Sequence, residues 1–125
     1  MQKTEPFKIS ITIKGLPALT NQRRVHWRKL QNESRMWKSQ VISKARLNKL
    51  PETPLVKAKL ILTRHSSSEP DYDGLVGSFK NCIDALVEIG ILQNDKMSNI
   101  GIPEYKWEKA KPGDGKIRIE VEADL

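Results

Sequence analysis

The amino-acid sequence predicts one α/β domain with a mixed sheet, in which the elements follow the order β-α-β-α-β-β. Three short segments alternate apolar and polar residues, which is typical of strands with one buried face. Two longer segments place apolar residues at helical spacing, and prolines or glycines separate the segments. Since 125 residues suit a single hydrophobic core, residues 1–125 are expected to fold as one domain.

The first half of the chain predicts a strand and then a long helix. Residues 7–14, FKISITIK, have an apolar residue at every second position, and the loop GLPALTN follows them. Between about 21 and 50 the pattern is that of an amphipathic helix, with Trp37, Val41 and Ala45 on its apolar face and a basic outer face. The helix ends at LPETP, because proline cannot continue it.

The second half predicts three strands and a second helix. Residues 55–63 alternate as a strand, and residues 74–89 have helical spacing that ends at Gly90, a natural C-terminal cap. An irregular strand is expected within 97–109 and a regular one over 116–123, with the turn KPGDGK between them. We expect the first three strands to pair in parallel through the helices and the last two to form a C-terminal hairpin.

Charge is distributed unevenly along the chain, which carries 22 basic and 15 acidic residues and a net charge of +7. Residues 1–50 contain 12 basic and 2 acidic residues, whereas residues 51–125 contain 10 basic and 13 acidic ones. A positive region of this density predicts contact with a polyanion, most commonly through phosphate groups. The alternative is a solvated basic helix that only keeps the protein in solution.

Several classes of protein are excluded by composition and motifs. A single cysteine, Cys82, cannot form a disulfide within the chain, which suits a reducing compartment. No apolar run approaches the ~20 residues that span a bilayer, and the N-terminus lacks a signal-peptide core. P-loop and EF-hand spacings are missing, and Cys82, His26 and His65 are too scattered for a structural zinc site. We therefore expect a cytoplasmic protein without a membrane partner.

Acidic residues gather in one segment of this basic chain, EPDYDGLVGSFKNCIDALVEIGILQND at 69–95. If residues 71–73 are extended, Asp71 and Asp73 point to the same side, and Asp95 can join them if the chain turns back after the second helix. Three carboxylates repel one another, and Mg²⁺, which prefers oxygen ligands, would remove that cost. The alternative is that DYD is an exposed loop and ND a simple turn.

The one lysine of the acidic segment is also a candidate for chemistry. Lys80 lies four residues before Asp84, so a helix would place both side chains on one face. Beside a carboxylate-bound metal ion, a lysine can donate to a phosphate oxygen and stabilise developing negative charge. The alternative is an ordinary ion pair within one helix.

The combination of these features resembles the RusA-type Holliday-junction resolvases, which are phage and prophage crossover junction endodeoxyribonucleases. The resemblance is carried by DYDGL, by Lys80 with Asp84-Ala85-Leu86, by Gly90 and Asp95, and by the N-terminal strand that precedes GLPALTNQRR. Its specific part is residues 71–95, although the order of elements agrees over nearly the whole chain.

The resemblance implies a Mg²⁺-dependent endonuclease, with Mn²⁺ as a substitute, that resolves Holliday junctions by paired symmetrical nicks. Asp71, Asp73 and Asp95 match the family's metal-binding catalytic aspartates, Lys80 its catalytic lysine, and Asp84 a supporting acid. The setting implied is the cytoplasm of a bacterial or phage-infected cell.

The resemblance also implies a homodimer bound to branched DNA, since two symmetry-related sites suit a four-way junction. The basic residues expected to contact its phosphates are Arg23, Arg24, Arg28, Lys29, Arg35 and Lys38. Two alternatives stay open. One is a non-catalytic nucleic-acid-binding module of the same fold, and the other is a metal-dependent nuclease that acts on other branched DNA or on RNA.

Overall fold

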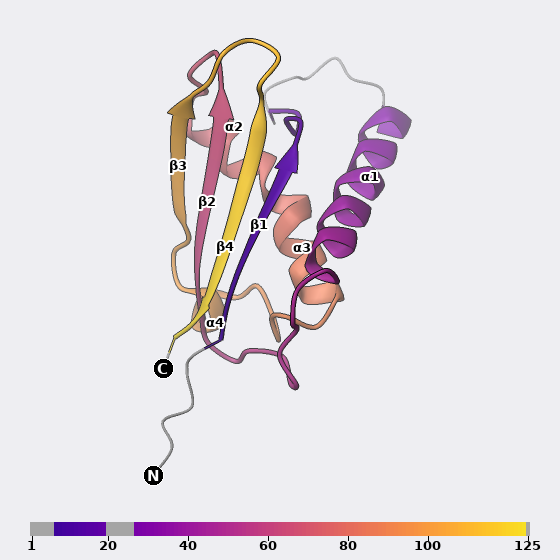
Figure 1. Cartoon of the computed structure of the whole chain (residues 1–125), viewed down its shortest axis with the longest axis vertical. Coiled ribbons are helices and arrows are strands. Elements are labelled where there is room, and N and C mark those ends of the chain that lie inside the picture. Colours follow the sequence, from indigo (N-terminus) through magenta and orange to yellow (C-terminus); the bar gives the residue numbers. More distant parts are fainter. Residues whose placement is uncertain (1–6, 20–26, 125) are drawn as a thin grey trace.

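The computed structural model describes residues 7–19 and 27–124, which form a sheet with helices packed against one of its faces (Figure 1). The elements are, in chain order, β1 (Lys8–Lys14), α1 (Trp27–Ala45), β2 (Ala58–Ser66), α2 (Tyr72–Ser78), α3 (Lys80–Glu88), α4 (Met97–Ile100), β3 (Glu104–Lys109) and β4 (Lys116–Ala123). The α/β class and the order of the predicted strands and main helices are therefore confirmed.

The four strands form one mixed sheet in the order β1-β4-β2-β3. β4 is antiparallel to both of its neighbours, β1 and β2, whereas β2 and β3 are parallel. The first three strands run in one direction, as expected, but only β2 and β3 are hydrogen-bonded to each other.

The C-terminal hairpin needs a correction in its pairing. β3 and β4 are consecutive, run in opposite directions and are joined by a tight turn at Gly113, yet β2 lies between them. The central position of β4 agrees with its burial, because Ile117, Ile119 and Val121 are fully buried. β3 carries mostly charged side chains, and such strands suit the edge of a sheet.

Element boundaries differ from the predicted ones at four places. The first helix, predicted to reach LPETP at about residue 50, ends at Ala45. The second strand occupies Ala58–Ser66 instead of 55–63. The second helix begins at Tyr72 and is divided at Phe79 into α2 and α3. Of the predicted irregular strand, Met97–Ile100 is a short helix, and only Glu104–Lys109 is extended.

The hydrophobic core lies between the sheet and the helices. Strand residues at alternate positions, such as Ile11 and Leu62, are buried on the covered face. Helix residues Trp37 and Val41 of α1 and Phe79 of α2–α3 fill the other side of this layer. The predicted apolar face of α1 is thus confirmed, and its burial anchors the basic outer face to the sheet. Within residues 7–19 and 27–124, every helix lacks either the length or the apolar character that crossing a membrane requires.

Candidate functional site

Asp71 begins α2 as its N-terminal cap. Its backbone is extended, with φ −71° and ψ 161°, and the backbone N–H of Gly74 donates to its Oδ1 at 3.2 Å. Asp73 already lies in the first helical turn. The predicted extended geometry of residues 71–73 is therefore wrong, because Asp71 caps the helix and Tyr72 and Asp73 already belong to it.

Lys80 and Asp84 lie on one face of α3, as their spacing predicted. The Lys80 ammonium is 4.0 Å from the Asp84 carboxylate, and the two side chains are 73% and 30% exposed. A pair as open as this stabilises the fold very little. Lys80 is thus held near Asp84 while its long side chain stays accessible to a ligand.

Asp95 reaches this helix face because the chain reverses after α3. Gly90 has φ +88°, and the buried Ile91 and Leu92 fix the returning segment, which also bridges to Leu55. The side chain of Asn94 accepts from the Asp95 backbone N–H at 2.8 Å. The reversal after Gly90 that the shared site required is therefore present, and Asp95 lines a pocket together with residues of α2 and α3.

A surface pocket of about 320 Å³ collects the polar residues of this face. Lys80, Asp84 and Asp95 contribute its charged groups. Its other lining residues are mostly apolar: Val76, Gly77, Ile83, Met97, Ile100, Gly101, Pro103 and Tyr105. The arrangement places one ammonium and two carboxylates around an opening with mostly apolar walls.

The structure does not assemble the predicted centre of three aspartates. In the parts of the chain that it describes, no three His, Cys, Asp or Glu side chains are grouped closely enough to hold a metal ion. Asp71 and Asp73 do not line the pocket, although Asp73 lies one helical turn before Gly77, which does. Asp84 and Asp95 are the carboxylates that share the pocket. Two carboxylates with waters and substrate phosphate are a usual coordination set for Mg²⁺.

Two tyrosines border the site and were not predicted from the sequence. Tyr105 of β3 lines the pocket, and its ring meets Tyr72 edge-on at 6.4 Å and Phe79 at 6.2 Å. Burial, and then the neighbouring Tyr72, raises the pKa of the Tyr105 hydroxyl, so the phenol stays neutral and can donate a hydrogen bond. Tyr72 itself is 64% exposed between the two aspartates of DYD.

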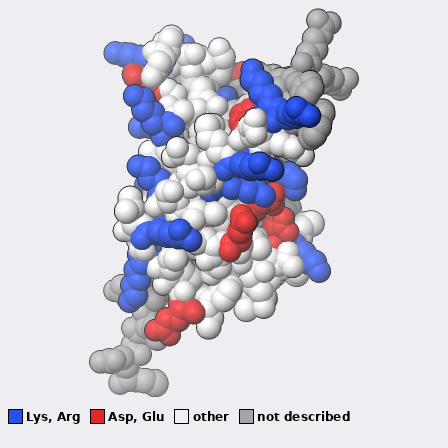
Figure 2. Space-filling view, turned by 90° about the vertical axis from the view of Figure 1, so that its right-hand side faces the viewer, with Lys and Arg blue, Asp and Glu red and all other residues white. Residues whose placement is uncertain are grey.

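The basic outer face of α1 lies on the other flank of α3. Arg28, Lys29 and Arg35 are exposed, and Arg35 and Lys38 line a groove of about 330 Å³ with Arg46 and Glu88. Figure 2, which views this side of the molecule, shows basic side chains spread around a smaller group of acidic ones. Of the other predicted DNA contacts, Arg23 and Arg24 lie outside the described residues. The Ser34 hydroxyl donates to Asn81 Oδ1 at 2.8 Å and ties α1 to α3.

A buried arginine holds the loop that precedes α1. Arg64 is only 7% exposed on the covered face of β2, and its Nη1 donates to the Pro17 carbonyl at 2.7 Å. Burial lowers the pKa of its guanidinium. Glu33 accepts from the Ala18 backbone N–H at 2.7 Å, so α1 and β2 both bind this loop. Arg64 follows Leu60 and Leu62 at every second position of β2, so it shares their buried side. This spacing was the sequence signal that Arg64 would be buried.

No protein-family model matches the chain, and no curated protein matches its sequence significantly.

Proposed function

We propose that this protein is a Mg²⁺-dependent endonuclease that nicks branched DNA, and that it acts as a homodimer resolving four-way junctions by paired symmetrical cuts. The observation that carries the proposal is the convergence of Lys80, Asp84 and Asp95 on one pocket. The family resemblance of residues 71–95 supports the same reaction. The setting proposed is the cytoplasm of a bacterial or phage-infected cell.

The three charged residues have distinct roles in this proposal. Asp84 and Asp95 would hold Mg²⁺, which when bound supplies charge neutralisation at the phosphate and activates water. Lys80 donates to a non-bridging phosphate oxygen, since its exposed ammonium can move while Asp84 keeps it beside the pocket. Asp73 and the capping Asp71 do not line the pocket, but both belong to the start of α2, the helix that contributes Val76 and Gly77 to it.

Substrate binding is assigned to the basic face of α1. α3 separates the groove at Arg35 and Lys38 from the pocket at Asp84, and a helix is about 10 Å wide. A phosphate backbone held along α1 can therefore continue across α3 to the pocket. Binding of this kind weakens steeply as salt rises, because each phosphate contact releases counterions.

A second candidate is a non-catalytic nucleic-acid-binding module. It is favoured by one observation, the lack of a three-ligand metal group among the described residues. It predicts binding to DNA that is unaffected by metal ions and is never followed by cleavage.

The test compares substrates and metals with the same full-length protein. Labelled four-way junction, flap, linear duplex and RNA hairpin are incubated in Mg²⁺, in Mn²⁺ or in EDTA. The proposal expects symmetrical nicks on the four-way junction in either metal, and no product in EDTA. Binding without product in every metal would establish the non-catalytic module. Equal cleavage of flaps, RNA and junctions would leave the nuclease but refute the junction selectivity.

A further inference from the structure

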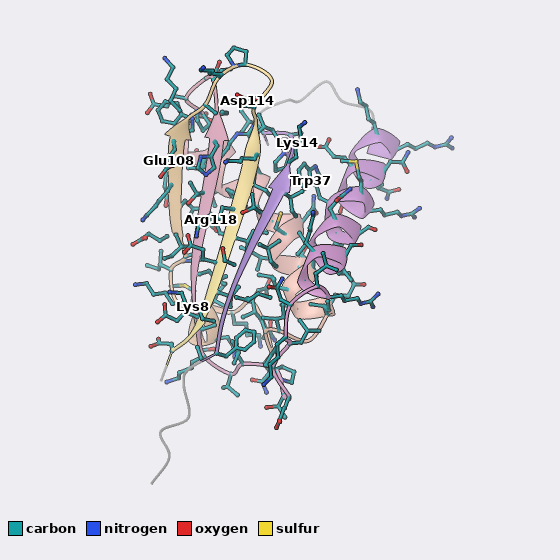
Figure 3. The ribbon with its side chains drawn as sticks, in the orientation of Figure 1. Lys8, Lys14, Trp37, Glu108, Asp114 and Arg118 are labelled. Carbon is teal, nitrogen blue, oxygen red and sulfur yellow. The ribbon has the colours of Figure 1, made fainter. Side chains whose placement is uncertain are left out.

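The sheet has a second face that no described helix covers, and its charges are unevenly compensated. Alternate residues of all four strands point away from the helix layer, and Figure 3 shows this face toward the viewer. Lys14, Asp114, Glu108 and Arg118 lie in its upper part, and Lys8 lies at its lower end (Figure 3).

Strand register orders the lower charges into a compensated row. Glu122 of β4 stands directly opposite Lys8 on β1 and opposite Lys59 on β2. Opposite charges across neighbouring strands are favourable, so this row stabilises the sheet locally. This row of opposite charges is the reference with which the charges at the other end of the same face can be compared.

The upper row has the reverse arrangement. Lys14 of β1 stands directly opposite Lys116 of β4, and Arg118 lies next along β4 between Thr12 and Thr63. Like charges placed opposite each other are destabilising. A change in the β1–β4 register cannot relieve this repulsion, because a shift of one residue would expose the buried Ile13 and Ile117.

Neighbouring acids compensate this row only in part. Glu108 pairs with His65 at 3.3 Å, and Glu120 lies 3.6 Å from Arg118. Among the described residues, neither Lys14 nor Lys116 forms an ion pair, although Asp114 borders the same hollow of about 390 Å³. The adjoining β3–β4 turn adds one more exposed lysine, Lys111. The cluster formed in this way, called the upper sheet cluster, comprises Lys14, Lys111, Lys116 and Arg118.

We propose that the upper sheet cluster binds the phosphate backbone of a second duplex segment of the DNA substrate. Its cations are spread over β1, β4 and the β3–β4 turn, which matches a row of phosphates better than a single anion. The exposed hydroxyl of Thr12 adds a donor between them. The cluster lies on the opposite face of the sheet from α1, so the two basic surfaces would hold separate duplex arms. The inference rests on the proposed nucleic-acid substrate, but not on cleavage.

The test uses a charge-matched pair of double variants of the full chain, Lys14→Gln/Lys116→Gln and Lys8→Gln/Lys59→Gln. Each removes two positive charges from the same sheet face. The affinity for a labelled four-way junction and for linear duplex is measured in EDTA over a range of salt concentrations. For the junction, the upper pair is expected to lower the slope of log affinity against log salt by about 2, because two phosphate contacts are lost. The lower pair is expected to leave that slope nearly unchanged.

Equal changes in the two variants would overturn the inference, because they would report only net charge. An unchanged slope in the upper variant would overturn it as well. Thermal unfolding controls for the fold: the upper variant should be at least as stable as wild type, since it relieves a repulsion. Failure of the proposed catalysis is distinguishable, because it appears as missing nicks in Mg²⁺ while the salt slopes in EDTA still differ between the variants.

Discussion

Replacing Asp71 by alanine separates the structural role of this residue from its proposed catalytic one. The carboxylate accepts the Gly74 backbone N–H at 3.2 Å and satisfies one of the free donors at the start of α2. Loss of such a cap costs about 1 kcal/mol, within a range of about 0.5–2 kcal/mol. In a chain of this size, about 1 kcal/mol corresponds to a fall in Tm of roughly 4 °C.

Asp71→Asn is the matched control, because asparagine caps helices about as well as aspartate but carries no charge. We expect Asp71→Asn to keep the wild-type Tm within about 1 °C, whereas Asp71→Ala should lower it by roughly 4 °C. The family resemblance implies that both variants nick junctions more slowly, because both lose the Asp71 carboxylate. Differential scanning calorimetry and a single-turnover nicking assay measure the two effects. Equal Tm values for the alanine and wild-type proteins would refute the capping role.

Two further predictions follow from close packing around α2 and α3. In Gly74→Ala the new Cβ would lie 2.5 Å from Asp71 Oδ1 and 3.5 Å from Leu19 Cβ, so the variant should lose the cap and about 1 kcal/mol. In an Asp71→Ala background the clash with the carboxylate is gone, and urea denaturation should show the same change to be neutral or stabilising. Burial raises the pKa of the Cys82 thiol from 9.0 to about 12, so thiol reagents at pH 8 should modify it only in denaturant. Because the unfolded thiol ionises near pH 9 and the folded one does not, the free energy of unfolding should fall as pH rises from about 9 toward 12, and less so in Cys82→Ala.

The alternation of strands and helices could be predicted because each element has a clear period in its apolar residues. Periodicity identifies which face of a strand is buried, but it does not identify the neighbouring strand. The insertion of β4 between β1 and β2 was therefore missed, since nothing local distinguishes it from a simple hairpin. The start of α2 was missed for another reason, because Asp71 was interpreted as a ligand and not as a cap.

Two features of the candidate site could be predicted from the sequence. They are the chain reversal after Gly90 and the helix face that carries Lys80 and Asp84. Gly90 indicated where the second helix would end, and the shared site required the chain to turn back there so that Asp95 could return. Which carboxylate it would meet depends on the length of the returning segment and on the position of α4, and neither is encoded in a local pattern. The structure favours Asp84 as its neighbour in the pocket. The sequence resemblance had given Asp84 only a supporting role.

The most direct test of the central claim is the single-turnover rate of four-way junction nicking in Mg²⁺ for wild type, Asp95→Asn and Glu69→Gln. Asp95 lines the pocket, whereas Glu69 is an exposed acid of the same segment that lines none of the described pockets. Both changes remove one negative charge and add an amide. The account predicts a rate at least about 100-fold lower for Asp95→Asn and an unchanged rate for Glu69→Gln. Wild-type nicking by Asp95→Asn, or equal losses in the two variants, would contradict it.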